Sequence, residues 1–173
     1  MGTALAAAGN TREAMIYYER ALRLQPEYAQ AHLNFGAALV AMGRSSEALE
    51  HYRHAVRLRP NFAVVHNNLA NLLTAEGRRE EAIRLMREGL AETPSHAPLL
   101  NNLGLALHEA GCLDEALSIL QQARSLAPDK SEIALNLAHT LLMTGRFEEG
   151  FAAYESRTLI APPSLAPRWQ GED

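Results

Sequence analysis

Four asparagines recur at one constant interval along the chain: Asn34, Asn68, Asn102 and Asn136. An unpaired amide in an apolar core is costly, so a core position would not carry asparagine four times. An amide side chain offers donors and an acceptor that complement the N–H and C=O groups of a peptide bond. This asparagine register predicts either a row that holds an extended peptide by its backbone, or amides that bond neighbouring units and fix their stacking.

Further polar side chains are expected on the same helix face as the asparagine register. At helical spacing the neighbouring candidates are Asn67, Asn71, Asn101, His108 and His139. None of them is Lys or Arg, so this surface lacks the cations that hold a terminal carboxylate or a strongly acidic partner. With the asparagine register they form the candidate peptide-binding site.

Histidines could serve as metal ligands or general bases. His51 and His54 are separated by one turn of a helix, which places them on one helix face. No carboxylates accompany them in the same register, so we interpret them as part of a solvated face. His32 and His66 are separated by the same interval as the asparagines, and we interpret them as packing residues between units. No metal site is expected.

Cys112 is the only cysteine of the chain. It excludes an intrachain disulfide and a metal site built from cysteines, and it fits a reducing compartment, from which we expect a cytoplasmic location. The sequence contains no Gly-rich phosphate loop and no nucleophile motif. We therefore expect no cofactor and no catalytic residue, and we do not expect the chain to be an enzyme.

The charge balance argues against nucleic acid as a partner. Lys and Arg number 16 and Asp and Glu number 20, a formal net charge of −4, whereas nucleic-acid recognition needs a basic patch or stripe. No apolar run approaches the roughly 18–20 residues that span a bilayer. A protein or an extended peptide is the expected partner.

The constant interval between the asparagines is a period that organises the elements around them. It is carried equally by Gly9, Gly43, Gly77, Gly111 and Gly145 and by Pro26, Pro60, Pro94, Pro128 and Pro162. Glycine can end a helix with a positive φ, and proline cannot continue a helix. Each unit is therefore predicted to contain two helices, and the fold class is all-α. The predicted helices span residues 29–42, 46–58, 63–76, 79–92, 97–110, 113–126, 131–144 and 147–160.

The residues that recur in each unit point to a known family. In one unit they are Phe35, Gly36, Gly43, Glu47, Ala48 and Pro60. This combination resembles the tetratricopeptide repeat, a helical hairpin of about 34 residues, and the resemblance covers residues 1–162. It implies an α-α superhelix whose first helices line a concave groove, and a scaffold that binds an extended peptide or a protein surface there. The asparagine register resembles the asparagine ladder in the repeat domain of O-linked N-acetylglucosamine transferases.

The period divides the chain into a partial repeat (1–26), repeats at 29–62, 63–96, 97–130 and 131–162, and an extended tail (163–173). The segment 145–171, which includes Phe147, Tyr154 and Trp169, resembles the junction between repeats and a glycosyltransferase-like domain in some bacterial proteins. The tail is therefore interpreted as a linker. Two alternatives stay open: a substrate-recruiting arm of a larger glycosyltransferase, and a scaffold that self-associates through apolar faces of its terminal repeats.

Overall fold

The computed structural model describes residues 1–156, and this part of the chain consists of ten helices without a strand. They are α1 (Gly2–Ala7), α2 (Thr11–Leu24), α3 (Ala29–Ala41), α4 (Ser45–Leu58), α5 (Ala63–Ala75), α6 (Arg79–Glu92), α7 (Ala97–Glu109), α8 (Leu113–Leu126), α9 (Ser131–Met143) and α10 (Phe147–Ser156). The all-α fold class is thus confirmed. From α3 to α9, every helix end lies within one residue of its predicted position. The tail, and the end of the last predicted helix, lie outside the described residues.

Each helical hairpin turns at its glycine. Gly43 has a φ of 74°, a left-handed conformation that glycine adopts without a steric penalty. The turn satisfies carbonyl groups that the end of α3 leaves open, because the N–H of Arg44 donates to the Leu39 carbonyl oxygen at 2.9 Å. The equivalent four glycines also have positive φ, so one turn geometry joins the two helices of every hairpin.

Small residues allow the two helices of a hairpin to approach closely. A Cβ atom added to Gly36 would lie 2.6 Å from the Tyr52 ring, and one added to Gly104 would lie 2.5 Å from Leu120. Ala48 and Ala82, near the starts of α4 and α6, are fully buried. The small-residue positions therefore set the distance between paired helices, and any larger side chain there would separate them.

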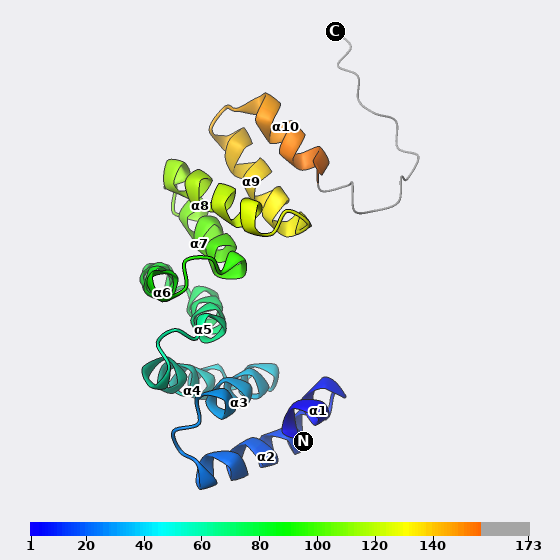
Figure 1. The fold of residues 1–173 in the computed structure, drawn as a ribbon, viewed down its shortest axis with the longest axis vertical. Coiled ribbons are helices and arrows are strands. Elements are labelled where there is room, and N and C mark those ends of the chain that lie inside the picture. Colours follow the sequence, from blue (N-terminus) through cyan, green and yellow to red (C-terminus); the bar gives the residue numbers. More distant parts are fainter. Residues whose placement is uncertain (157–173) are drawn as a thin grey trace.

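Successive hairpins stack into a curved array (Figure 1). Among the first helices, α5 contacts α7 and α7 contacts α9, while α5 also contacts the second helix α4 of the preceding hairpin. In Figure 1, α5 lies on the inner side of the curve and α6 on the outer side. The array therefore presents an inner face built from first helices and an outer face built from second helices.

Every helix within residues 1–156 is too short or too polar to span a bilayer.

Candidate functional site

The asparagine register lies on consecutive first helices. Asn34 belongs to α3, Asn68 to α5, Asn102 to α7 and Asn136 to α9, and all four are half-buried. Because α5 contacts α7, α7 contacts α9, and one hollow is lined by both α3 and α5, the sequence period becomes a row of amides along the inner face. The structure thus brings the register together as the repeat pattern predicts.

Two asparagines of the register bond to the preceding unit. Asn102 donates through Nδ2 to Oδ1 of Asn67 at 2.9 Å and to Oδ1 of Asn71 at 2.8 Å. Asn136 donates in the same way to Oδ1 of Asn101 at 2.9 Å. These bonds join α5 to α7 and α7 to α9, so they agree with the stacking interpretation of the register at these two junctions.

The buried Asn101 also bonds to the following unit. It is only 3% exposed, and it donates to a carboxylate oxygen of Glu132 at 3.3 Å while it accepts from Asn136. Both ends of its amide are therefore satisfied, as burial of a polar group requires. Asn101 is a structural link between α7 and α9, with little surface left for a ligand.

A second polar link joins α7 and α9 through a residue that the sequence analysis missed. Thr140 is fully buried, its hydroxyl donates to the Asn136 carbonyl oxygen at 2.8 Å, and its Oγ1 lies 2.9 Å from Nδ1 of His108. Because the hydroxyl hydrogen of Thr140 is already donated to Asn136, Nδ1 of His108 must be the donor to Oγ1 of Thr140. The sequence did contain a signal for Thr140. Ala106 holds the equivalent position of the preceding unit, so Thr140 is a polar residue at a position that is apolar there. His139 is exposed.

The other two asparagines of the register have different partners. Asn34 accepts from Gln30 at 3.0 Å within α3. Leu33 holds the place in its unit that Asn67 holds in the next, so Asn68 finds no amide in the preceding unit and bonds instead to Tyr52 of α4. Burial raises the pKa of Tyr52, and the hydrogen bond with Asn68 opposes this rise.

Two hollows adjoin one another on the inner face. The first, of about 330 Å³, lies between α3 and α5 and includes Asn68 and Tyr52 in its lining. The second, also of about 330 Å³, lies between α5 and α7 and includes Asn102. Asn71 and Ala75 line both. Three of the candidate asparagines, Asn68, Asn71 and Asn102, therefore rim two adjoining hollows whose remaining lining is largely apolar.

The histidines of α3 and α4 form a cluster, so the solvated-face interpretation of His51 and His54 is wrong. The ring centroids of His51 and His54 lie 5.1 and 4.3 Å from that of His32, and both side chains are half-buried. These positions, distant in the sequence, meet because the hairpin folds α4 back onto α3. His66, by contrast, is 2% exposed and packs near Gly89, as a packing residue should.

Hydrogen bonding assigns the protons of this histidine cluster. Nε2 of His32 lies 2.8 Å from the Pro26 carbonyl oxygen, and its Nδ1 lies 2.9 Å from Nδ1 of His51. A carbonyl oxygen only accepts, so Nε2 of His32 carries the hydrogen and its Nδ1 accepts from His51. A proton added to His32 would set two N–H groups against each other. Protonation of His32 would therefore require His51 to move its hydrogen from Nδ1 to Nε2, so the arrangement favours a neutral His32.

Burial is the main cause that lowers the pKa of both His32 and His51. The charged groups that act on this pair are His54, Arg57, Glu47 and Glu50. The cations add to the lowering, while the two carboxylates oppose it at His51 and the Pro26 carbonyl opposes it at His32. Within the described part of the chain, no three His, Cys, Asp or Glu side chains, these histidines included, are arranged so that they could hold a metal ion. We interpret the cluster as a packing and titrating element.

Comparison with known proteins identifies the repeats. The model of the family described as Tetratricopeptide repeat matches residues 39–106 and 107–170, and a second model with the same description matches residues 1–63. No curated protein matches the chain closely enough to count as a relative.

Three solved structures illustrate the similarity of the fold. PilF of Pseudomonas aeruginosa has a TM-score of 0.85 at 24% identity, with 94% of this chain and 74% of that chain covered. TTC0263, a thermophilic repeat protein of Thermus thermophilus, has a TM-score of 0.73 at 28% identity, with 95% and 90% covered. YrrB has a TM-score of 0.73 at 20% identity, with 93% and 83% covered. Because the family models match most of its length, the chain belongs to the tetratricopeptide repeat family.

Proposed function

We propose that the chain binds an extended peptide along the inner face of its superhelix. The repeats support a general role as a protein-interaction scaffold. The observation that carries the finer proposal is the pair of adjoining, largely apolar hollows between α3, α5 and α7. Asn68, Asn71 and Asn102 rim them, so pockets for side chains and groups for a peptide backbone occur together.

The amide pairs leave polar atoms that could serve a ligand. Asn102 uses its Nδ2 hydrogens on Asn67 and Asn71, and its Oδ1 accepts from no other described residue. Asn67 accepts through Oδ1, and its Nδ2 donates to no described residue. One acceptor and one donor thus remain on neighbouring helices, which matches the N–H and C=O of a peptide. Stacking and peptide contact are therefore compatible roles for one asparagine.

The spacing of the hollows suggests how a peptide would enter them. Packed helices lie about 8–10 Å apart, and an extended chain advances about 3.3 Å per residue. Because the side chains of an extended chain alternate between two sides, only residues two apart (about 6.6 Å) or four apart (about 13 Å) point to the same side. Such a pair would enter the hollow beside Asn68 and the hollow beside Asn102. Apolar side chains suit the linings, which include Leu72 and Leu105. The carboxylate of Glu109, which lines the second hollow, disfavours an acidic residue there.

The expected affinity is modest. A hydrogen bond contributes about 0.5–1.5 kcal/mol net, so a few backbone contacts alone give no better than millimolar binding. Burial of one or two apolar side chains in the hollows adds about 1.5–3 kcal/mol each. The proposed ligand therefore depends on its apolar anchors. One of the similar structures, YrrB, is described as a repeat protein with an unusual peptide-binding site, which supports a peptide ligand.

The test is to fill the hollows without touching the core. Ala75 is exposed and lines both hollows, so Ala75→Phe should block them. The matched control is Ala91→Phe, an exposed position on the second helix α6. Peptides selected from a random library on the parent chain should bind Ala75→Phe at least roughly tenfold more weakly, and the control with unchanged affinity, as measured by fluorescence anisotropy.

Equal affinity of the parent and Ala75→Phe, with unchanged helicity, would place the ligand elsewhere and refute the groove. Loss of binding in both phenylalanine variants would mean that added apolar surface disturbs the assay. In that case, the smaller change Ala75→Leu replaces Ala75→Phe. A selected peptide whose apolar anchor side chains are replaced by alanine should also bind the parent chain more weakly if the hollows hold these side chains.

A second candidate function is self-association, favoured by the apolar surface of the last hairpin. Phe147 is 60% exposed and Phe151 is 56% exposed, one turn apart on α10. If this surface joins two copies, Phe147→Ser with Phe151→Ser will lower the mass found by light scattering at high protein concentration. Val64→Ser, at an exposed apolar position of a central repeat, should leave the mass unchanged.

Three predictions from the sequence remain predictions. They are the link to a glycosyltransferase, whose suggested junction extends into residues outside the described part, the cytoplasmic location, and the absence of enzymatic activity. The tail residue Trp169 likewise lies outside the described residues. Sequencing of the gene downstream of Asp173 would test the first of them directly.

A further inference from the structure

A third hollow opens on the outer face. It has a volume of about 270 Å³ and lies between the second helices α4 and α6. Its apolar lining comprises Val56, Leu69, Leu73 and Leu85, and none of its residues belongs to the two inner hollows. Ligand pockets for drug-sized molecules measure about 300–1,000 Å³, so this one suits a single side chain rather than a cofactor.

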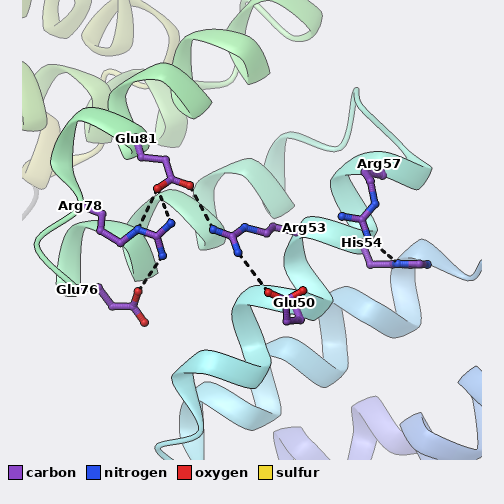
Figure 2. A network of polar contacts seen from close by, with 7 residues as sticks. All are labelled: Glu50, Arg53, His54, Arg57, Glu76, Arg78 and Glu81. Atoms are coloured by element: carbon purple, nitrogen blue, oxygen red, sulfur yellow. Dashed lines mark hydrogen bonds and ion pairs between the residues drawn. The ribbon is translucent and has the colours of Figure 1, made fainter.

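Ion pairs occupy part of the rim of this outer hollow (Figure 2). Arg53 of α4 donates to Glu50 at 3.2 Å and to Glu81 of α6 at 3.3 Å. Glu81 also accepts from Nε of Arg78 at 2.9 Å. The carboxylate of Glu81 is therefore shared by two guanidinium groups, and it offers little negative charge to anything that enters the hollow.

The remaining charge of the rim is positive. Arg57 of α4 and Arg84 of α6 line the hollow from opposite sides. Arg57 contacts Nδ1 of His54 at 2.9 Å, an imidazole nitrogen rather than a carboxylate, as Figure 2 shows. Neither arginine forms an ion pair within residues 1–156, and Glu88 is the other carboxylate in the lining. Two arginines thus face one unshared glutamate.

Stacking of the repeats does not require these two arginines. At the next junction, between α6 and α8, Ala91 stands in the place of Arg57 and Ser118 in the place of Arg84. That junction also stacks, since α6 contacts α7 there as α4 contacts α5. The cationic rim is therefore a feature of one junction, added to a fold that does not depend on it.

We propose that the outer hollow is a second docking site, for a partner segment in which one apolar side chain is flanked by carboxylates. The apolar floor accommodates the side chain, and the planar guanidinium groups of Arg57 and Arg84 match carboxylates. The inner groove carries Glu109 and Glu132 instead, so it disfavours the same segment. The two faces then select partners of opposite charge.

The probe is a fluorescein-labelled, capped peptide with one leucine between glutamates, measured by anisotropy on the whole chain. Arg57→Gln with Arg84→Gln should weaken binding roughly fivefold to tenfold. The matched control, Arg12→Gln with Arg20→Gln, removes the same charge from exposed positions of α2 and should leave the affinity unchanged. Replacement of the leucine of the probe by alanine should also weaken binding.

A charge reversal separates docking from a purely structural role. Arg84→Glu should bind a lysine-flanked version of the probe better than the parent does, a gain that loss of folding cannot produce. The proposal is overturned if the glutamate probe does not bind at all, or if both double variants weaken it equally, which would indicate unspecific charge attraction. It is also overturned if Ala75→Phe abolishes binding, since the probe would then occupy the inner groove.

Discussion

Two stretches of the inner face use the same asparagine in different ways. Between α7 and α9, Asn136 bonds to Asn101 of the preceding unit. Between α3 and α5, Leu33 stands in the place of Asn101, and Asn68 bonds to Tyr52 instead. The repeat position sets where the amide lies, whereas the neighbouring unit decides what it does. A residue that recurs in every repeat therefore need not have one role.

The second helices add to the difference that Leu33 makes. Tyr52 of α4 supplies a hydroxyl close to Asn68, whereas Met86 and Leu120 occupy the equivalent positions of α6 and α8 and supply none. Asn102 and Asn136 therefore find their partners in the preceding first helix. Asn68 thus reaches the second helix of the preceding unit, whereas Asn102 and Asn136 reach its first helix, and in each case the amide joins neighbouring repeats.

The largest expected effect on stability is at the junction between α7 and α9, where Asn136 pairs with Asn101. Asn101→Leu converts the junction between α7 and α9 to the leucine found at position 33. The side chain still fills the site, but the bonds to Asn136 and Glu132 are lost. The free energy of unfolding should fall by about 1–3 kcal/mol, as measured by urea denaturation. A variant as stable as the parent would show that the amides contribute nothing to stacking.

A second prediction concerns pH and the other end of the molecule. The lowered pKa values of His32 and His51 mean that the unfolded chain binds protons more readily than the folded chain. Stability should therefore be complete above the ordinary histidine pKa of about 6.5 and fall as the pH drops below it. Thermal melts from mildly alkaline to mildly acidic pH measure this fall.

The matched variant for this pH dependence is His51→Gln, which retains a donor for Nδ1 of His32. Its stability should fall less steeply with acid than that of the parent. An unchanged slope would mean that other groups, such as the carboxylates, govern the acid sensitivity. The histidine cluster lies entirely in the α3–α4 hairpin and its entry turn at Pro26. The pH dependence therefore reports on this hairpin and not on the junction between α7 and α9.

The smallest effect is expected at Asn34. Among residues 1–156, the one side-chain partner of its amide is Gln30 of the same helix, from which it accepts. Asn34→Ala should change the free energy of unfolding by no more than about 0.5 kcal/mol, the range of surface substitutions. Urea denaturation beside Asn101→Leu gives the contrast directly, and a loss as large as that of Asn101→Leu would erase the difference between the two regions.

Most of the fold could be predicted from the sequence because its signals are local. Glycines such as Gly43 mark the turns and prolines such as Pro60 mark the ends of units, so the helix ends followed within one residue. The place of the asparagine register followed from the same period. Its bonding did not, because the partner of each amide depends on whether asparagine or leucine stands one position earlier in the preceding unit.

The histidine cluster and the outer hollow were beyond that local pattern. His32 meets His51 only after α4 folds back onto α3, and Arg53 meets Glu81 across two hairpins. Such contacts join residues 19 and 28 positions apart on different helices. These contacts can be predicted from the sequence once the hairpin geometry is known, because the period then shows which positions of neighbouring helices face one another.

The central claim is that the asparagine register joins repeats by hydrogen bonds between amides in one part of the array and not in another. A double-mutant cycle on stability tests this claim most directly. Asn67→Ala, Asn102→Ala and their combination should show a coupling of about 0.5–1.5 kcal/mol in urea denaturation, because a hydrogen bond joins the two residues across repeats. The same cycle on Asn34 and Asn68 should show a coupling near zero. Equal coupling in both cycles, or none in either, would contradict the account.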